Sequence, residues 1–178
     1  MIARMKRLLL VAVLLAAAPA SALADYDGGR EAYRTGDFEG ALREWLPLVR
    51  SDDPRVRHSL GILFLYGRAV ERDAEAAAAL FAQAAEEGLP DSQYALATLF
   101  RDGTGVSRNV AEAVRLYRLA AVQDHVGAQT SLGILYANGD GVERDGVAAQ
   151  MWFQLAEARG DPRAAVNGQR LAGVIAPD

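Results

Sequence analysis

Side chains able to carry out acid–base or nucleophilic chemistry are scarce in this chain of 178 residues. His58 and His125 are the only histidines, and no spacing pairs them as metal ligands or as a base with a nucleophile. The chain has no cysteine, which excludes a thiol nucleophile, a disulfide framework, Cys-ligated zinc and an iron–sulfur cluster. We therefore expect both histidines to be solvated or to line a groove, and we expect no enzymatic activity.

The segment Asn138-Gly139-Asp140-Gly141 has the composition of a cation-binding loop. Val142 occupies the next alternating ligand position, however, and no glutamate closes a loop of about 12 residues as calcium sites require. A phosphate-binding loop is excluded as well, because no Gly-Lys-Ser/Thr sequence follows these glycines. We expect the glycines to form turns, and we expect neither a metal nor a cofactor.

The body of the chain is acidic. Residues 25–178 contain 16 arginines, no lysine and 23 acidic residues, which give a formal charge of −7. Every group of arginines is interleaved with Asp or Glu. Proteins that bind nucleic acid present a basic face that releases counterions from the phosphates. The sequence therefore argues against nucleic acid as a partner.

The N-terminus has the three parts of an export signal. Three basic side chains and no acid stand before an apolar stretch from Leu8 to Ala18, and Ala22-Leu23-Ala24 is typical of a cleavage site. We predict a signal peptide over residues 1–24, cleaved after Ala24, and hence a periplasmic or secreted protein with no membrane span after cleavage. The alternative is an uncleaved anchor, although the apolar stretch is shorter than the roughly 20 residues that a span needs.

The remainder of the chain repeats with a period of 36 residues. Shifting the sequence by this distance superimposes leucines, aromatic residues, glycines and small residues in three copies without a gap. The coinciding positions include Leu60/Leu96/Leu132, Phe64/Phe100/Tyr136, Gly67/Gly103/Gly139, Asp73/Asn109/Asp145, Phe81/Tyr117/Phe153 and Ala84/Ala120/Ala156. Such a period predicts a stack of similar structural units.

Each repeat predicts two α-helices. In the first helix, Leu60 and Phe64 share one face, and the adjacent Gly61 lets a second helix approach closely. Glycines end this helix because they tolerate a positive φ angle. An aspartate or asparagine then starts the second helix as its N-cap, and Asn109 with Glu112 forms a capping box.

Aromatic residues from both helices are expected to interlock in the core of the stack. These aromatic residues are Phe64, Phe100, Tyr136, Trp45, Phe81, Tyr117 and Phe153. Alanine outnumbers the β-branched residues in the body of the chain, so helix is favoured over strand by propensity as well as by period.

These repeats resemble the Sel1-like repeat family, whose members are related to tetratricopeptide repeats. The shared pattern is a small residue after Leu, an aromatic residue three positions further on, Gly-x-Gly-Val, and then Asp, Ala, an aromatic residue and Ala-Ala. The copy from Gly127 to Asp161 follows this pattern most fully. In the first copy Ala69 replaces the second glycine, and we expect the turn there to differ in detail.

The resemblance implies an all-α fold, a right-handed α-solenoid of stacked antiparallel helix pairs that forms a single domain over residues 25–178. Sel1-like repeats are expected at residues 55–90, 91–126 and 127–162. Residues 26–54 resemble a tetratricopeptide repeat, with Gly36 and Trp45 in that family's spacing. Residues 163–172 are expected to form a lone helix that caps the last repeat, because solenoids need capped ends.

Family resemblance also implies a protein–protein adaptor. We expect a non-catalytic scaffold in the periplasm that binds a protein or peptide partner, such as a sensor-kinase ectodomain or an envelope complex. Two alternatives remain open. One is an enzyme of cell-wall or β-lactam chemistry, as in Cys-rich relatives whose disulfides this chain lacks. The other is a membrane-anchored assembly factor that keeps residues 8–24.

In such a stack the first helix of each pair lines the concave side. Offsets from the core face place a row of mixed Arg, Tyr, polar and aliphatic residues there. The row consists of Arg55, His58, Ile62, Leu65, Asp91, Tyr94, Thr98, Arg101, Thr130 and Ile134. Because Tyr and Arg are frequent at interface hot spots, we expect a peptide or helix to lie along this row. Arg55 and Arg101 are expected to clamp its carboxylates.

Overall fold

The computed structural model describes residues 25–175 of the chain. Within them it contains nine α-helices, one short 3₁₀ helix and no β-strand. The elements are α2 (Tyr26–Thr35), α3 (Phe38–Trp45), η1 (Leu46–Leu48), α4 (Pro54–Tyr66), α5 (Ala74–Glu86), α6 (Pro90–Asp102), α7 (Val110–Ala121), α8 (Val126–Asn138), α9 (Gly146–Glu157) and α10 (Pro162–Ile175). The predicted signal peptide, residues 1–24 with its cleavage site, lies outside the described residues.

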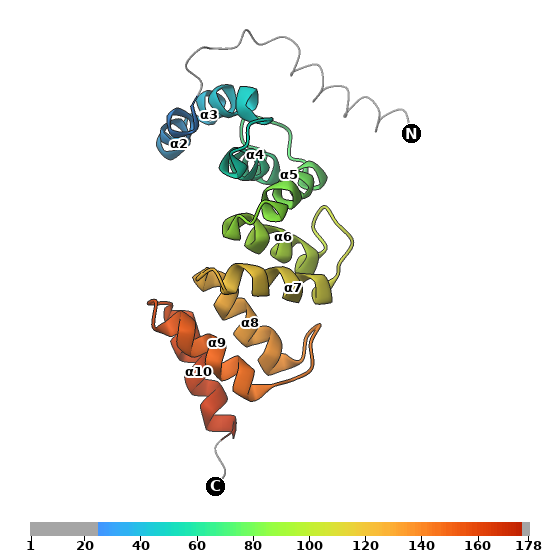
Figure 1. Cartoon of the computed structure of the whole chain (residues 1–178), viewed down its shortest axis with the longest axis vertical. Coiled ribbons are helices and arrows are strands. Elements are labelled where there is room, and N and C mark those ends of the chain that lie inside the picture. Colours follow the sequence, from blue (N-terminus) through green and yellow to red (C-terminus); the bar gives the residue numbers. More distant parts are fainter. Residues whose placement is uncertain (1–24, 176–178) are drawn as a thin grey trace.

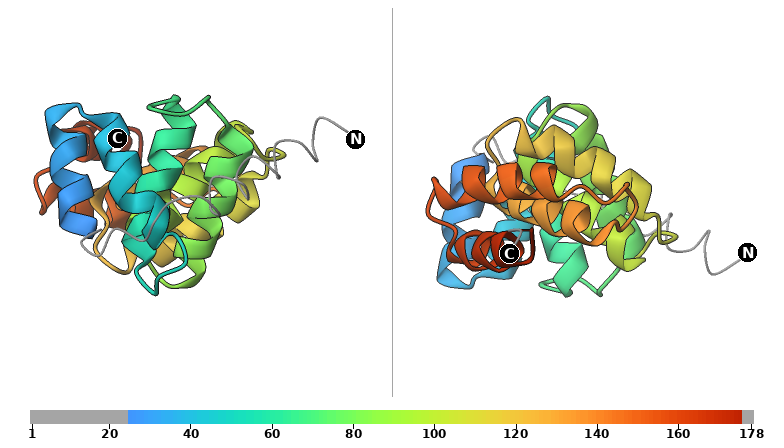
Figure 2. Two further views of the ribbon diagram at one scale, coloured as in Figure 1. Left: turned by 90° about the horizontal axis from the view of Figure 1, so that it is seen from above. Right: turned by 90° about the horizontal axis from the view of Figure 1, so that it is seen from below.

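Successive helices form antiparallel pairs that stack along the long axis of the molecule (Figure 1). α4 packs on α5, α6 on α7 and α8 on α9, and the second helix of each of the first two pairs contacts the first helix of the next. The pair of α2 and α3 contacts α4 at one end, and α10 lies against α9 and α8 at the other. Seen from either end, α2 and α10 lie on the same side of the stack (Figure 2). The expected all-α solenoid is confirmed.

Two glycines on the first helices bring the paired helices into close contact. A Cβ atom on Gly61 would lie 2.6 Å from Cε1 of Phe81, and one on Gly133 would lie 2.4 Å from Cε1 of Phe153. Both distances are far shorter than a van der Waals contact between carbon atoms, so only glycine leaves room for these rings. Phe81 and Phe153 are consequently buried. The sequence predicted this close approach of the paired helices from the small residue that follows the leucine.

The aromatic residues of the second helices form the core, whereas those of the first helices only border it. The buried aromatic residues are Trp45, Phe81, Tyr117 and Phe153. The half-buried ones are Phe64, Phe100 and Tyr136, which were expected to be core residues as well. Each of these three stands shortly before the glycine that ends its helix and packs against the core while staying partly exposed.

The turn between the two helices of each repeat uses one recurring set of hydrogen bonds. Left-handed glycines end the first helices, and these are Gly67, Gly103 and Gly139. Side-chain oxygens cap the second helices by accepting backbone N–H bonds, and they belong to Asp73, Asn109 and Asp145. Arginine Nε–H groups donate to carbonyls near the end of the first helices, from Arg72, Arg108 and Arg144. The turn is therefore tied to both helices.

The predicted capping box is only half formed. The Asn109 side chain accepts a hydrogen bond from the N–H of Glu112 at 3.0 Å, as expected. The carboxylate of Glu112 turns away and accepts from Arg115 at 2.7 Å. It is free to do so because the N–H of Asn109 already donates to the carbonyl of Phe100 at 2.8 Å.

The turn of the first repeat has the backbone conformation of the others, although Ala69 replaces a glycine there. Its φ angle is 59°, against 71° for Gly105 and 68° for Gly141, so the expected difference in the turn is absent from the backbone. A Cβ atom on Gly105 would lie 2.2 Å from the carbonyl oxygen of Ala74 in the preceding repeat. Ala69 is exposed, so its methyl group finds room and only the strain of the left-handed conformation remains.

The last helix is longer than predicted, since α10 runs from Pro162 to Ile175 rather than over residues 163–172. Oδ1 of Asp161 accepts a hydrogen bond from the N–H of Arg163 at 2.9 Å and so caps the start of α10. Ala164 is buried in the cluster that also contains Phe153. This contact covers the end of the last helix pair.

Candidate functional site

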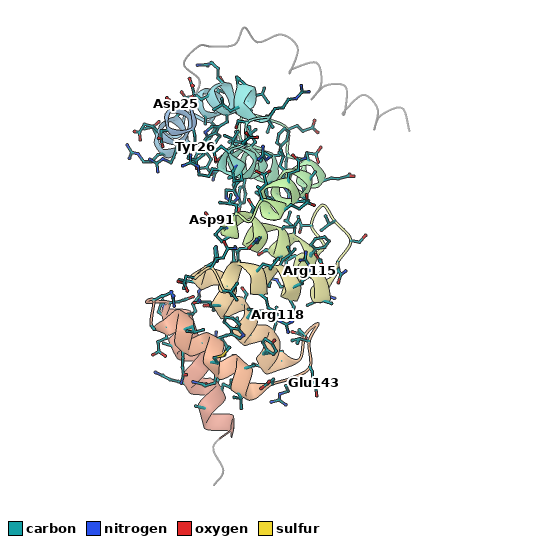
Figure 3. All side chains as sticks on the ribbon, in the orientation of Figure 1. Asp25, Tyr26, Asp91, Arg115, Arg118 and Glu143 are labelled. Atoms are coloured by element: carbon teal, nitrogen blue, oxygen red, sulfur yellow. The ribbon has the colours of Figure 1, made fainter. Side chains whose placement is uncertain are left out.

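Most of the predicted groove residues lie on one face of α4, α6 and α8. Figure 3 places Asp91, at the start of α6, on the side toward which α2 and α10 project. The exposed members of the row are Arg55, Asp91 and Ile134. The half-buried members are His58, Ile62, Leu65, Tyr94, Thr98 and Arg101. We call these partly exposed side chains on neighbouring first helices the groove floor.

Thr130 does not belong to this floor, which corrects the prediction from the sequence. It is only 3% exposed, and its hydroxyl donates to Oδ2 of Asp161 at 2.7 Å. Asp161, just before α10, therefore covers Thr130, which its spacing along α8 had placed in the groove. Hydrogen bonds from Arg163 and then from Thr130 hold the pKa of Asp161 at about 2, well below its usual value.

The two arginines expected to clamp a partner's carboxylates are already paired within the chain. Arg55 contacts Asp53 through Nε at 2.9 Å and NH2 at 2.6 Å, and its guanidinium lies 4.3 Å from the ring centre of Tyr26. Arg101 contacts Asp102 through Nε at 2.7 Å and NH2 at 3.0 Å. Each arginine therefore already uses two of its nitrogens on an aspartate of its own chain, and a partner carboxylate would compete with that aspartate.

The structure brings the two histidines close to the start of α6, although the sequence placed them in different repeats. Nδ1 of His58 lies 2.9 Å from Oγ of Ser92. The ring of His125 stacks on Tyr94 with 4.4 Å between the centroids, and its Nε2 lies 3.5 Å from Oδ1 of Asp91. His58 thus joins two neighbouring repeats, and His125 joins the start of α8 to the start of α6. Spacing along the chain indicated neither contact.

A cleft of about 530 Å³ opens between α6, the turn that follows it, and α8. Its lining residues are Arg101, Asp102, Arg108, Val110, Ser131, Ile134, Leu135 and Asp140. Only Arg101 and Ile134 were predicted. The others come from the turns and from the helix positions next to the predicted row, which a single set of offsets along each helix could not reach. The cleft combines an aliphatic patch with two basic and two acidic side chains.

Next to the cleft, a buried tyrosine supports the groove floor. The hydroxyls of Tyr117 and Thr98 lie 3.0 Å apart, and the rings of Tyr117 and Tyr94 are 5.6 Å apart. Burial raises the pKa of Tyr117, so its phenol keeps its proton at neutral pH. The second helix α7 thereby holds two residues of α6 in place.

The repeats match a known family over more than half of the chain. The pattern described as Sel1 repeat matches residues 57–89, 90–125 and 126–161. The chain belongs to the Sel1 repeat family. These three Sel1 repeats cover the helix pairs α6–α7 and α8–α9 and, apart from the first three residues of α4, the pair α4–α5. They include every predicted groove residue except Arg55. No curated protein matches the sequence.

Two solved structures resemble the Sel1 array in fold and in sequence. A Sel1 repeat protein from Oxalobacter formigenes is 32% identical, with a TM-score of 0.77 over 81% of this chain and 59% of that chain. A protective antigen present in uropathogenic Escherichia coli strains, which displays an SLR fold, is 30% identical. Its TM-score is 0.74 over 79% of this chain and 32% of that chain. The present chain therefore spans less than two thirds of either protein.

One Ser–His pair in the Sel1 array has the residue types of a nucleophile and its base, but its serine is not exposed to a substrate. The pair is Ser92 and His58. The side chain of Ser92 is 0% exposed, so a substrate cannot reach its hydroxyl. We interpret this hydrogen bond as a contact that joins two Sel1 repeats.

No helix within residues 25–175 is long and apolar enough to cross a membrane. In the same part of the chain, no three His, Asp or Glu side chains come together as ligands of a metal ion.

His125 is the N-cap of α8 in its neutral form. Its Nδ1 accepts a hydrogen bond from the N–H of Ala128 at 3.1 Å, which a protonated Nδ1 cannot do. Burial lowers the pKa of both His125 and His58 below 6.5, and the nearby Asp91 opposes part of the shift in each. The folded Sel1 array therefore favours uncharged histidines.

We expect the protein to lose stability as the pH falls below about 6.5. The unfolded chain binds protons from that pH downward, whereas the folded chain binds them only at lower pH because both histidine pKa values are lowered. The histidine contribution is thus complete above pH 6.5 and decreases toward the lowered values. Thermal unfolding at about pH 7.5 and about pH 5.5 checks this expectation.

The matched variant is His125→Asn, which keeps a cap acceptor but does not titrate. Its melting temperature should fall less between the two pH values than that of the wild type. A wild-type melting temperature that does not fall, or an equal fall in both proteins, contradicts the role assigned to His125.

Proposed function

We propose that this Sel1-repeat chain is a non-catalytic scaffold that binds a segment of a partner protein along its concave side. The observation that carries the proposal is the cleft between the C-terminal parts of α6 and α8, which the predicted row reaches at Arg101 and Ile134. Ile134 is 40% exposed there beside polar and charged side chains. An apolar anchor point surrounded by polar groups is the usual anatomy of a protein-binding surface.

The groove is suited to binding because its floor is held in place before a partner arrives. Tyr94 stacks on His125, and Thr98 contacts the hydroxyl of Tyr117. Side chains that are already ordered lose little conformational entropy on binding. Stacked helix pairs also form an extended concave surface, which suits an elongated segment of a partner better than a small molecule.

We further propose that the mature chain acts in the periplasm, in an envelope signalling or assembly complex, with a sensor-kinase ectodomain as one candidate partner. Support comes from the basic N-terminus, the apolar stretch from Leu8 to Ala18 and the small residues at Ala22 and Ala24. The membrane-anchored alternative differs only in keeping residues 8–24. The N-terminal mass of the exported protein and its phase partitioning distinguish the two.

An enzyme of cell-wall or β-lactam chemistry is the alternative function. Its best candidate residues are His58 and Ser92, and the burial of Ser92 argues against it. Turnover of a β-lactam or of a cell-wall peptide that is lost in Ser92→Ala would favour this alternative over the scaffold.

Replacing Ile134 by Glu is expected to weaken capture of the partner by at least about tenfold, because the substitution puts a charge on the apolar patch of the cleft. Residues 25–178 serve as bait, crosslinked to proteins of the periplasm and of the solubilised envelope. The captured partner is then titrated against the wild type and the variant. The exposed position of Ile134 lets the new carboxylate face water, so the melting temperature should stay close to that of the wild type.

Val147→Glu is the matched control. Val147 is 81% exposed on α9, a second helix that does not line the cleft, and its replacement should leave binding unchanged. Wild-type affinity in both variants would show that the concave side is not the binding surface. A loss confined to Val147→Glu would move the site to the second helices.

A further inference from the structure

One row of equivalent positions runs along the first helices near their N-terminal ends. It consists of Arg55 on α4, Asp91 on α6, Gly127 on α8 and Arg163 on α10, at intervals of 36 residues. The row carries charges of both signs. What distinguishes its members is whether a neighbouring residue neutralises that charge.

Both arginines of this row are neutralised by an aspartate two residues earlier. NH2 of Arg55 lies 2.6 Å from Oδ2 of Asp53, and NH2 of Arg163 lies 3.1 Å from Oδ2 of Asp161. Leu89 occupies the corresponding position before Asp91 and cannot neutralise it. Asp91 therefore differs from the arginines at the two ends of the row, because no residue of opposite charge precedes it in its own segment.

Nε2 of His125, just before the start of α8, lies 3.5 Å from Oδ1 of Asp91. His58 on α4 is a second nearby titratable group, and burial lowers its pKa although Asp91 opposes part of that shift. His125 is held neutral because its Nδ1 caps α8 and because burial lowers its pKa. It can offer Asp91 at most a long hydrogen bond and not a full positive charge. The side chain of Asp91 is 63% exposed, so its carboxylate remains accessible.

An aromatic wall stands beside this carboxylate. The ring of Tyr94 stacks on that of His125, and a Cβ atom on Gly127 would lie 3.3 Å from the Tyr94 ring. Gly127 thus adds no side chain of its own to the row at this point. A carboxylate next to aromatic rings is the combination that proteins use for cationic side chains, because the rings attract the cation and pack against its aliphatic stem.

We propose that Asp91, with the wall formed by Tyr94 and His125, binds a Lys or Arg side chain of the partner segment, so that the concave side recognises a basic partner. This inference rests on the proposed function and names the chemistry of the partner. Arg55 and Arg163 do not oppose it, since each is paired with its own aspartate.

The charge of the whole chain favours the same partner. Residues 25–178 carry a formal charge of −7, which attracts a basic segment over distances longer than a contact and repels an acidic one. The same charge implies that binding weakens as salt is added. This proposal is the opposite of the acidic segment that Arg55 and Arg101 were expected to clamp.

The test uses three fluorescent peptides of about 12 residues that share their aliphatic residues and carry lysine, glutamine or glutamate at the same three positions. Anisotropy titrations at neutral pH use the full mature chain. We expect the lysine peptide to bind about tenfold more tightly than the glutamine peptide, and the glutamate peptide to bind most weakly. Asp91→Asn should remove the difference between the lysine and glutamine peptides.

Glu143→Gln is the matched control, since Glu143 is an exposed acid in the turn before α9, away from Asp91 (Figure 3). It should keep the full preference for lysine. Unchanged helicity and melting temperature in both variants exclude unfolding as the cause. A lysine peptide that binds no better than the glutamate peptide, or a preference that survives Asp91→Asn, overturns the inference, and so does the absence of binding by all three peptides.

The outcome also separates this inference from the proposed function. Equal binding of the three peptides that is lost in Ile134→Glu would overturn the preference for a cation and support the groove. Binding of the lysine peptide that responds to Asp91→Asn but not to Ile134→Glu would support the cation site and count against the cleft as the main binding surface.

Discussion

Leu132→Ala is expected to lower the free energy of unfolding by about 2 to 5 kcal/mol. Leu132 is fully buried on α8, in a cluster that also contains Ala128, Leu135 and Tyr117. Truncation removes apolar contacts and leaves a cavity that the packed helices fill only in part. Because each repeat contacts only its neighbours, the loss should also loosen α6 and α7. Urea unfolding followed by circular dichroism measures the loss, and hydrogen exchange shows which helices it reaches.

Ile134→Ala is the matched control for this prediction. Ile134 lies two residues further along α8 but is 40% exposed, so its truncation should cost less than about 1 kcal/mol. A loss below about 1 kcal/mol for Leu132→Ala would show that this face of α8 does not hold the repeats together.

Gly105→Ala is expected to destabilise the protein by about 2 to 5 kcal/mol, for two reasons that add. Gly105 has a φ of 71°, which strains any residue with a Cβ atom. In addition, that Cβ atom would lie 2.2 Å from the carbonyl oxygen of Ala74 and 2.8 Å from the backbone nitrogen of Glu75. These are backbone atoms at the start of α5, so relief requires the second repeat to move away from the first. Urea unfolding gives the magnitude.

Gly103→Ala separates backbone strain from the collision. Gly103 also has a φ of 71°, but its Cβ atom would lie 3.2 Å from Cβ of Arg108 and no closer than 3.6 Å to backbone atoms of that residue. We expect a cost of about 1 to 2 kcal/mol, close to the strain alone. Ala69 shows that the fold accepts such strain where there is space. Equal losses for Gly105→Ala and Gly103→Ala would mean that the contact with α5 does not limit the spacing of the repeats.

The spacing between repeats also shapes the cleft. Val110 and Asp140 line it, and the neighbouring Gly141 lies so close to Val110 that a Cβ atom would be 2.7 Å from Cγ1 of that valine. The turn of the third repeat thus packs closely against the start of α7 beside the cleft. Substitutions that push repeats apart should therefore weaken partner binding as well as stability.

The sequence by itself determined the repeat, the helices and their ends. A 36-residue period places Leu60, Leu96 and Leu132 on equivalent faces, and left-handed glycines with polar N-caps mark where helices stop and start. These features are local, because hydrogen bonds within a few residues and the apolar period decide them. The glycine at Gly61 even indicated close packing of the paired helices. Membership of the Sel1 repeat family follows from the same residues.

The tertiary structure decided which of the predicted groove residues are exposed and which groups they contact. Offsets along each helix identified Tyr94, Arg101 and Ile134, but they also included Thr130, which the start of α10 buries. They could not show that Arg101 is already paired with Asp102, nor that His125, just before the start of α8, reaches Asp91 at the start of α6. The physical reason is that spacing along a helix specifies which side a residue faces, whereas contacts between repeats depend on how far each pair is rotated and shifted on its neighbour. That rotation and shift come from the packing of whole helices, and no single position in the sequence encodes them.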